Sequence, residues 1–409
     1  MSISRRWLLK GISLGSLSGA LPPFVPALTA RRAPSPYERL GIRPVINFRG
    51  TMTTLGASKM WPELHEAATQ ASSEYIMLEE LKAKVGERLA ALIGTEDAVV
   101  TTGAAGAIAL GTCAALTGSD TEKIRRLPDL AGMKTEVVIQ KVHRTGYDHA
   151  VRSTGARLVE VETEDELVRA MTDQTAMMFF LGGTSYDWRW QTPPISLERC
   201  LEITRGANVP LMVDAANMLP PWGNLRRLAS QGVDLICISG GKHMRGPQCS
   251  GILAGRRDLI QAAWLNSSPH SDSHGRPMKV GREEMVSVWL TAEKYSRLDF
   301  DALDRECVKQ AEYIERELSV VPGLQLQRTP VDRTRNIRRV MVHWDEAAAG
   351  ITAAEVERRL MEGEPRIAVG RAQPQGIELT VFMNEAGDEK IAVRRIKEIF
   401  RATESAAKG

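Results

Sequence analysis

Short apolar runs alternate with segments of helical periodicity between residues 98 and 254, and this alternation limits the fold more than any other feature. The runs contain few polar residues, as in strands covered by helices on both faces. Strands that alternate with helices favour a parallel sheet of the α/β class. The expected strands are 98–100, 137–139, 158–161, 176–181, 210–213, 235–239 and 252–254, and the expected helices are 104–116, 149–154, 164–171, 197–205 and 225–231. We therefore predict a large doubly wound α/β domain.

The pattern changes beyond about residue 260, and 409 residues are more than one domain usually holds. Before the alternating region lie an expected strand, 45–48, and an expected helix, 62–93. After it we expect helices at 283–298, 302–318, 355–361 and 389–401, and strands at 338–344 and 377–382. The predicted parts are an export signal (1–30), an N-terminal arm (31–60), the large domain (61–298) and a small C-terminal α+β domain (299–409).

The first thirty residues have the composition of a signal peptide. The pair Arg5-Arg6 precedes an apolar stretch, 11–28, that is rich in small residues. A twin arginine at this place is typical of the Tat export route. We expect a periplasmic or extracellular protein, or a cytoplasmic one if this segment is not a functional signal. No other stretch approaches the ~20 apolar residues of a membrane span.

Charge and cysteine content exclude several classes of function. The chain has 53 basic and 50 acidic residues, a net charge of +3, and no run of five like charges, so we expect no nucleic-acid surface. Its five cysteines are far apart and odd in number, which argues against a disulfide framework and against a metal site. The expected partner is a small molecule.

A loop of small residues, Thr101-Thr-Gly-Ala-Ala-Gly106, joins an expected strand to an expected helix. Backbone amides at the start of a helix bind anions when no large side chain covers them. Gly103, Ala104 and Ala105 are therefore candidate phosphate ligands. The same residues would also suit close packing of the helix on the sheet.

An acidic residue, Asp214, ends the apolar strand 210–213. Ligands of α/β folds bind at the carboxyl ends of strands. An aspartate there can also cap a helix or hold a ribose or a metal, so this position alone leaves the chemistry open.

Lys242 follows the strand 235–239 and two glycines, within Ser239-Gly-Gly-Lys-His-Met-Arg-Gly-Pro-Gln248. A lysine beside a buried strand needs a partner or a depressed pKa, which suits a Schiff-base lysine. Ser239 could bond a cofactor phosphate. The alternative is a solvated lysine in a surface loop.

The order of these three features is typical of fold-type-I enzymes that use pyridoxal 5′-phosphate (PLP). Asp214 would keep the pyridine nitrogen protonated, so that the ring acts as an electron sink. Lys242 would hold the cofactor aldehyde and then move the substrate Cα proton.

Residues 38–402 resemble the family of bacterial L-seryl-tRNA(Sec) selenium transferase and its small-molecule relatives, which include D-glucosaminate-6-phosphate ammonia-lyase. The resemblance rests on Gly41-Ile-Arg-Pro-Val-Ile-Asn47, on the loop 101–105, on His143-Arg144…Tyr147-Asp-His149 and on the motif 239–248. It implies the aspartate-aminotransferase-like fold, PLP on Lys242, Asp214 as the pyridinium partner and a homo-oligomer, a dimer or larger.

The same resemblance suggests further site residues. His149 matches the position at which related enzymes stack a ring on the cofactor, and Tyr147 competes for that role. Arg144, Arg245 and, in the C-terminal domain, Arg366 are candidates for binding a phosphate or a substrate carboxylate.

The leading functional hypothesis is α,β-elimination from a small amino acid or amino sugar acid, with Lys242 as the base. Transamination and racemisation remain alternatives. Selenocysteine synthesis on seryl-tRNA is disfavoured by the export signal and by the balanced charge. A hypothesis of another class is an exported, non-catalytic binding or scaffold protein.

Overall fold

The computed structural model describes residues 34–183, 193–329 and 337–408. The predicted twin-arginine signal, 1–30, lies outside the described residues and stays a prediction. The chain separates into two compact units, residues 1–44 and 45–409. The described part of the first unit holds one short helix, α1 (Pro36–Arg39), which Ser35 and Glu38 cap reciprocally.

A seven-stranded sheet forms the centre of the region predicted as the large domain, in the order β2-β8-β7-β6-β5-β3-β4. Its strands are β2 (Asp97–Thr101), β3 (Glu136–Gln140), β4 (Arg157–Val161), β5 (Thr175–Leu181), β6 (Leu211–Asp214), β7 (Leu235–Ser239) and β8 (Gly251–Gly255). Most neighbours are parallel, as predicted, but β8 runs antiparallel to both β2 and β7. The predicted parallel arrangement does not extend to this strand, because the chain turns back after β7 without a crossover helix.

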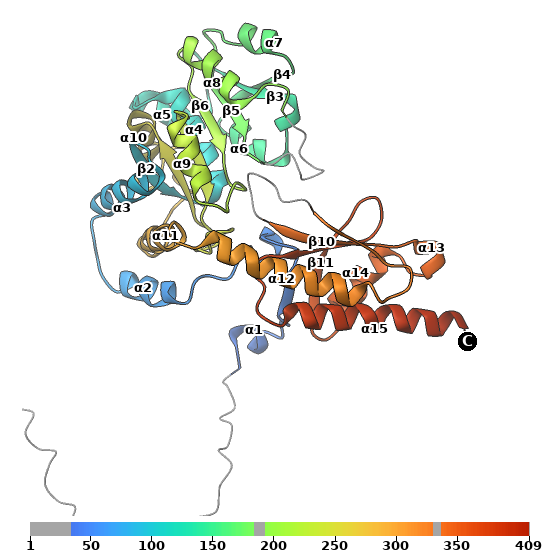
Figure 1. Cartoon of the computed structure of the whole chain (residues 1–409). Helices are drawn as coiled ribbons and strands as arrows, with labels where there is room; N and C mark the ends of the chain where they lie inside the picture. The colour runs from blue at the N-terminus through green and yellow to red at the C-terminus, as the bar shows by residue number, and fades with distance from the viewer. Residues whose placement is uncertain (1–33, 184–192, 330–336, 409) are drawn as a thin grey trace, which may run out of the picture. The chain divides into compact units, whose positions relative to one another are not determined.

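Successive residues of each central strand enter opposite apolar cores. In β5, Met178 and Phe180 pack in one core, and Met177 and Phe179 pack in the other. Helices α3 (Leu78–Ile93), α7 (Glu164–Arg169), α8 (Leu197–Gly206), α9 (Gly223–Ser230) and α11 (Arg282–Tyr295) contribute to the first core, and α4 (Gly103–Thr117), α6 (His149–Arg152) and α10 (Arg257–Leu265) to the second. Two covered faces explain why the strands lack polar alternation (Figure 1).

The predicted helix 62–93 is two helices in the structure, α2 (Glu63–Ser72) and α3. Arg282 explains the break at the end of α2. Its guanidinium donates hydrogen bonds to the carbonyls of Ala71 (2.7 Å) and Ser72 (2.5 Å), which would otherwise accept from the next helical turn. A short helix, α5 (Thr121–Arg126), which the sequence analysis did not predict, follows α4.

A five-stranded sheet, in the order β1-β11-β12-β10-β9, forms the centre of the C-terminal region. Its strands are β1 (Val45–Phe48), β9 (Gln325–Arg328), β10 (Arg338–His343), β11 (Arg366–Arg371) and β12 (Ile377–Val381). The N-terminal strand β1 pairs in parallel with β11, more than three hundred residues later. The edge strand β9 was not predicted, because its residues are polar and mostly exposed.

The same region contains four helices, α12 (Phe300–Leu318), α13 (Glu346–Ala349), α14 (Ala353–Glu362) and α15 (Asp388–Lys408). Apolar residues of β1, β10, β11 and β12 share one core with residues of α12, α14 and α15. Among the described helices, none is both long and apolar enough to cross a membrane.

Candidate active site

The order of the large sheet gathers the predicted site residues along one edge. The parallel strands β2, β7, β6, β5 and β3 all end there, and β8 begins there. Gly251 pairs with Thr101 on one side and with Ser239 on the other. Asp214 pairs with Leu181 of β5 and with Cys237 of β7. The small-residue loop, the Lys242 loop and Asp214 therefore meet at this edge.

The first turn of α4 is open for an anion. Thr102 is the N-cap residue, but its side chain makes no capping bond. Gly106 is the first residue of α4 whose amide bonds back into the turn, to the carbonyl of Thr102. No described residue accepts a hydrogen bond from the amides of Gly103, Ala104 or Ala105. A helix of 15 residues presents its positive end there, which suits a phosphate.

The conformation of this loop depends on two glycines, at positions where a side chain would be strained or would clash. Gly103 has a φ of 68°, a left-handed backbone conformation in which residues other than glycine are strained. Gly251 lies so close that a Cβ on it would be 2.3 Å from the carbonyl carbon of Gly103. Any larger residue at position 251 has to displace the loop.

The G251A substitution should therefore weaken cofactor binding. Moving the loop misaligns amides that each donate a charge-assisted bond, so we expect the dissociation constant of PLP to rise about 10–100-fold. Titration of the cofactor-free protein with PLP, followed by absorbance, measures this. G223A is the control, because nothing lies within 4 Å of a Cβ there. Unchanged affinity in G251A, with an unchanged melting temperature, would contradict the assignment of the loop.

Asp214 is a buried carboxylate, and few interactions offset the cost of burying its charge. It is 5% exposed, and its Oδ1 accepts one hydrogen bond, from the Ala216 amide at 3.0 Å. Burial raises the pKa of Asp214, while the Ala216 amide and the charge of Lys242 lower it by less. The charge of Lys242 acts on this carboxylate but does not offset the effect of burial. A carboxylate in this state suits a protonated ring nitrogen, which would supply the missing positive charge.

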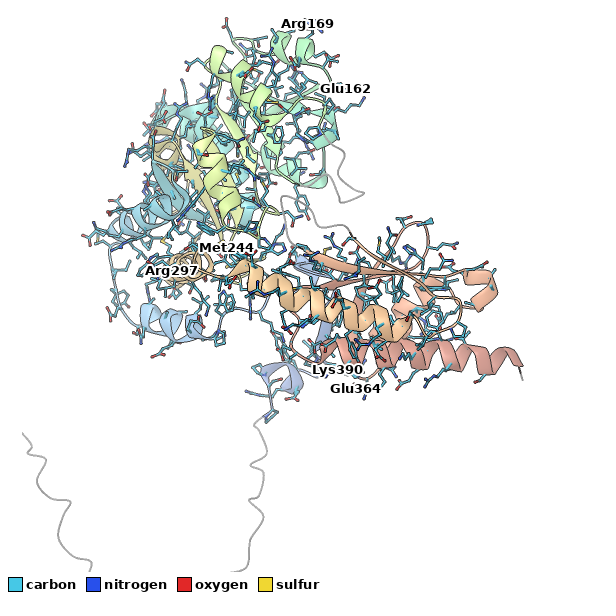
Figure 2. The ribbon with its side chains drawn as sticks, in the orientation of Figure 1. Glu162, Arg169, Met244, Arg297, Glu364 and Lys390 are labelled. Atoms are coloured by element: carbon cyan, nitrogen blue, oxygen red, sulfur yellow. The ribbon has the colours of Figure 1, made fainter. Side chains whose placement is uncertain are left out.

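The loop that carries Lys242 is held tightly. The amide of Gly246 donates to the carbonyl of Gly240 (2.9 Å), and Ser58 Oγ donates to the carbonyl of Gly241 (2.7 Å). A Cβ on Gly241 would lie 2.5 Å from the backbone of Gln248, so glycine is needed there. Lys242 itself is half-buried. Figure 2 labels Met244 in this loop, two residues after the lysine.

The structure places a different histidine at the sheet edge from the one that the sequence analysis chose. His149 is exposed at the start of α6, and Tyr147 is 62% exposed. His143 is buried, with its edge against Phe180 at 4.5 Å between ring centroids. Its Nδ1 accepts from the amide of Leu181 at 3.4 Å, and Leu181 pairs with Asp214.

His143 is therefore a further candidate for the ring-stacking position, which the sequence analysis did not choose. Burial lowers its pKa to about 4, so its imidazole is neutral at pH 7. The signal available in the sequence was its distance of only three residues from the end of β3. The role of His149 stays a prediction.

The three candidate arginines differ in what they already bind. Arg144 donates to Asp148 (2.6 Å) and pairs with Glu160, so it is neutralised. Arg366 begins β11, beside Val45, and donates through Nε to the carbonyl of Met361 (3.0 Å). These contacts use both side chains within their own parts of the fold. Arg245 lies in the Lys242 loop itself.

A loop of the C-terminal region reaches the residues around Lys242. The ring of Phe382 lies 5.1 Å from that of His243. Asn384 donates to the carbonyl of Asn47 at 2.8 Å. Met383 between them has a φ of 66°, which is unusual for a residue with a side chain. The sequence offered no signal for this loop.

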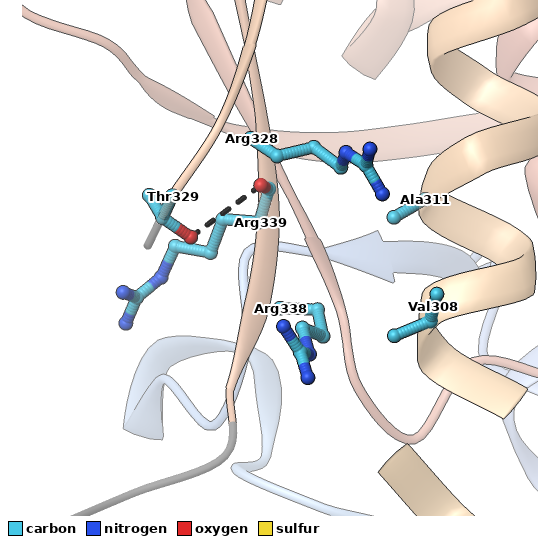
Figure 3. A pocket seen from close by; sticks show the side chains of 6 residues that line it. All are labelled: Val308, Ala311, Arg328, Thr329, Arg338 and Arg339. Carbon is cyan, nitrogen blue, oxygen red and sulfur yellow. Dashed lines mark hydrogen bonds between the residues drawn. The ribbon is translucent and has the colours of Figure 1, made fainter. Parts of the chain in front are cut away.

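A small cavity in the C-terminal region does not form a second anion site. It is lined by Val308, Ala311, Arg328, Thr329, Arg338 and Arg339 (Figure 3). Each of the three arginines is paired, Arg328 with Glu312 and Glu315, Arg338 with Asp304 and Arg339 with Glu378. Their charge is therefore used within the fold.

Known proteins share this architecture over nearly the whole chain. A 5′-C-glycyluridine monooxygenase-decarboxylase of Streptomyces sp is 31% identical over 376 residues, which cover 89% of this chain and 91% of that protein. A D-glucosaminate-6-phosphate ammonia lyase of Salmonella typhimurium is 29% identical, over 90% of this chain and 98% of that protein. A solved structure of D-glucosaminate-6-phosphate ammonia-lyase has a TM-score of 0.79 at 28% identity and covers 91% of this chain and 100% of its own.

A more distant structure supports the fold class. Serine palmitoyltransferase, solved with PLP, has a TM-score of 0.56 at 13% identity, with 88% of each chain covered. The predicted fold-type-I architecture and the prediction of an enzyme are confirmed. Residues 45–269 match the family model described as L-seryl-tRNA selenium transferase. This chain belongs to the L-seryl-tRNA selenium transferase family.

Proposed function

We propose that this enzyme uses PLP, bound to Lys242, to eliminate a β-substituent from a hydroxylated α-amino acid or amino sugar acid. The observation that carries the proposal is the buried carboxylate of Asp214, short of a cation, on the same sheet edge as an open helix N-terminus and a lysine. The names of two relatives support the substrate class. Glucosaminate 6-phosphate and glycyluridine each join an amino acid to a sugar skeleton.

The residues have separate roles in this reaction. When bound, PLP supplies an electron sink for the carbanion at the substrate Cα. The amides of Gly103, Ala104 and Ala105 would hold its phosphate, and Asp214 would keep a proton on its ring nitrogen. Lys242 Nζ removes the proton from the substrate Cα and donates a proton to the departing β-hydroxyl group, which leaves as water. The enamine that remains is hydrolysed to a keto acid and ammonia.

In the same scheme, the imidazole of His143 would pack near the cofactor without adding a charge, because it is neutral. A cation at this position would compete with the ring nitrogen for the carboxylate of Asp214. The low pKa of His143 prevents this at neutral pH.

A substrate screen tests the proposed function. The purified protein, loaded with PLP, is offered hydroxylated amino acids and amino sugar acids, with and without phosphate. We expect equimolar ammonia and keto acid from one group of these compounds. Amino-group transfer to an added keto acid, without ammonia, would replace elimination by transamination. Oxygen consumption with release of CO2 would favour the chemistry named for the Streptomyces relative.

Selenyl transfer is the second candidate function, because the matching family model carries that description. It requires binding of a tRNA, which is driven by phosphate contacts and weakens with salt. The balanced charge of this chain argues against such a surface. Salt-sensitive binding of seryl-tRNA in the same screen would support this alternative over elimination.

A further inference from the structure

Arg245 is held in a backbone conformation that costs free energy. Its φ is 62°, in the left-handed region that glycine adopts without strain. The loop is fixed there by hydrogen bonds from the Arg245 amide to the carbonyl of Lys242 (3.1 Å) and from the Trp61 amide to the carbonyl of Arg245 (3.2 Å). Trp61 Nε1 also donates to the carbonyl of Met244 (2.9 Å). The surrounding contacts maintain this strain at a residue with a long side chain. Such strain suggests that the side chain has a functional role.

The guanidinium of Arg245 is placed by two contacts that leave most of its donors unused. Its Nε donates to the carbonyl of Lys59 at 2.8 Å. Its central carbon lies 4.1 Å from the centroid of the Trp61 ring, a cation–π distance. No described residue accepts a hydrogen bond from Nη1 or Nη2. These two nitrogens form the side of the guanidinium that binds carboxylates in a bidentate manner.

The charges around Arg245 do not cancel. Lys294 contacts the same indole, at 4.3 Å, and pairs with Glu63. Lys59 pairs with Glu385 at 2.5 Å. The cluster thus has three cations and two carboxylates, and both carboxylates are paired with the lysines.

Among the described residues, no carboxylate lies within 4.0 Å of Arg245, although it is half-buried and burial lowers its pKa. Arg144 and the arginines of the small cavity in Figure 3, by contrast, have acidic partners. The cluster around Arg245 lacks one anion.

We propose that Arg245, stacked on Trp61, binds an acidic group of the amine substrate, a carboxylate above all, and so selects amines that carry one. The hydrogen bond between the Arg245 amide and the carbonyl of Lys242 keeps this guanidinium in the same loop as the reacting Nζ. A substrate held at both places has its amine and its acid group oriented at once. This assignment rests on the proposed function, since it takes Lys242 as the reacting amine.

The test compares paired ligands that differ in their acid group. Hydroxylated α-amino acids, D-glucosaminate among them, are each paired with a counterpart in which a neutral group replaces the acid group, such as D-glucosamine or the amide. Their dissociation constants are measured by calorimetry on the PLP-loaded full chain, which needs no chromophore. We expect R245Q to weaken binding of the acidic members about 10–100-fold and to change the neutral members less than twofold.

Three further variants separate recognition from structure. R245G removes the side chain and relieves the left-handed strain, so it should fold at least as stably and lose the same selectivity. R245K keeps the positive charge but not the paired donors of the guanidinium, so its affinity for the acidic ligands should fall by less than that of R245Q. R88Q changes an exposed arginine on α3 and should bind every ligand as the wild type does.

Several outcomes would overturn the proposal. One is a wild-type protein that binds no acidic ligand more tightly than its neutral counterpart. Another is an R245Q variant whose affinity falls equally for both members of each ligand pair. Release of PLP from R245Q would assign the guanidinium to the cofactor phosphate instead. Failure of wild-type protein to develop the visible absorbance of bound PLP would count against the proposed function and not against Arg245.

Discussion

The K242A variant should lose the visible absorption of bound PLP and at least about 10⁴-fold in kcat. In the proposed reaction Lys242 supplies both the covalent anchor of the cofactor and the base that moves the Cα proton, and general-base catalysis alone contributes about 10²–10⁴-fold. The loop itself should survive, because the bonds that hold it, from Gly246 to Gly240 and from Ser58 to Gly241, do not involve the lysine side chain.

Reduction with borohydride locates the cofactor directly. In wild-type protein the peptide that contains Lys242 should gain the mass of a pyridoxyl phosphate group, and in K242A no peptide should. The control is K84A, at an exposed lysine of α3, which should keep the absorption and the rate. A reduced adduct on any other lysine, or full absorbance in K242A, would show that Lys242 is not the anchor.

The D214N variant should become less active and, without cofactor, more stable. With PLP bound as proposed, the change would break a buried pair between the carboxylate and the ring nitrogen, and such losses cost about 3–5 kcal/mol, or about 10²–10⁴-fold in kcat. Without PLP the same carboxylate is buried and short of a cation. Removing it should raise the free energy of unfolding at pH 7 by at least about 1 kcal/mol.

The dependence on pH follows from the direction of the pKa shift. Burial raises the pKa of Asp214 in the folded, cofactor-free protein above its value in the unfolded chain, which is about 4. The stability that this carboxyl group contributes is complete below that value and is lost as the pH rises through the folded pKa. The difference in unfolding free energy between D214N and wild type should therefore grow from pH 4 upwards.

Urea unfolding of the cofactor-free proteins across this range measures the effect. D173N changes an exposed aspartate and should follow the wild-type curve at every pH. A cofactor-free D214N that is less stable than wild type at pH 7, or that keeps its kcat when loaded, would refute the role of Asp214.

Local sequence was informative where one physical preference dominates. The seven strands of the large sheet lie where continuous apolar runs predicted them, because burial on both faces leaves no place for polar residues. The break between α2 and α3 escaped prediction, because the cause is Arg282, two hundred residues away. The strand β9 escaped because an exposed edge strand needs no apolar pattern.

The candidate site divides in the same way. Lys242, Asp214 and the loop from Thr101 to Gly106 could be chosen from the sequence, since each lies at or just after the end of an apolar run predicted as a strand, where α/β folds bind ligands. The choice between His143 and His149 could not be made there. Both follow the same strand, and only burial, with the contact from Leu181, distinguishes them.

The sequence by itself determined that this chain forms a layered α/β fold with a lysine and an aspartate at strand ends, because burial and strand termination act over a few residues. Tertiary structure alone decided what surrounds them. Because β8 runs antiparallel to its neighbours, Gly251 lies against the small-residue loop, 101–106; β1 joins the other sheet, and Trp61 contacts Arg245. These contacts join segments more than a hundred residues apart, and their partners are set by the packing of the whole sheet rather than by any local preference.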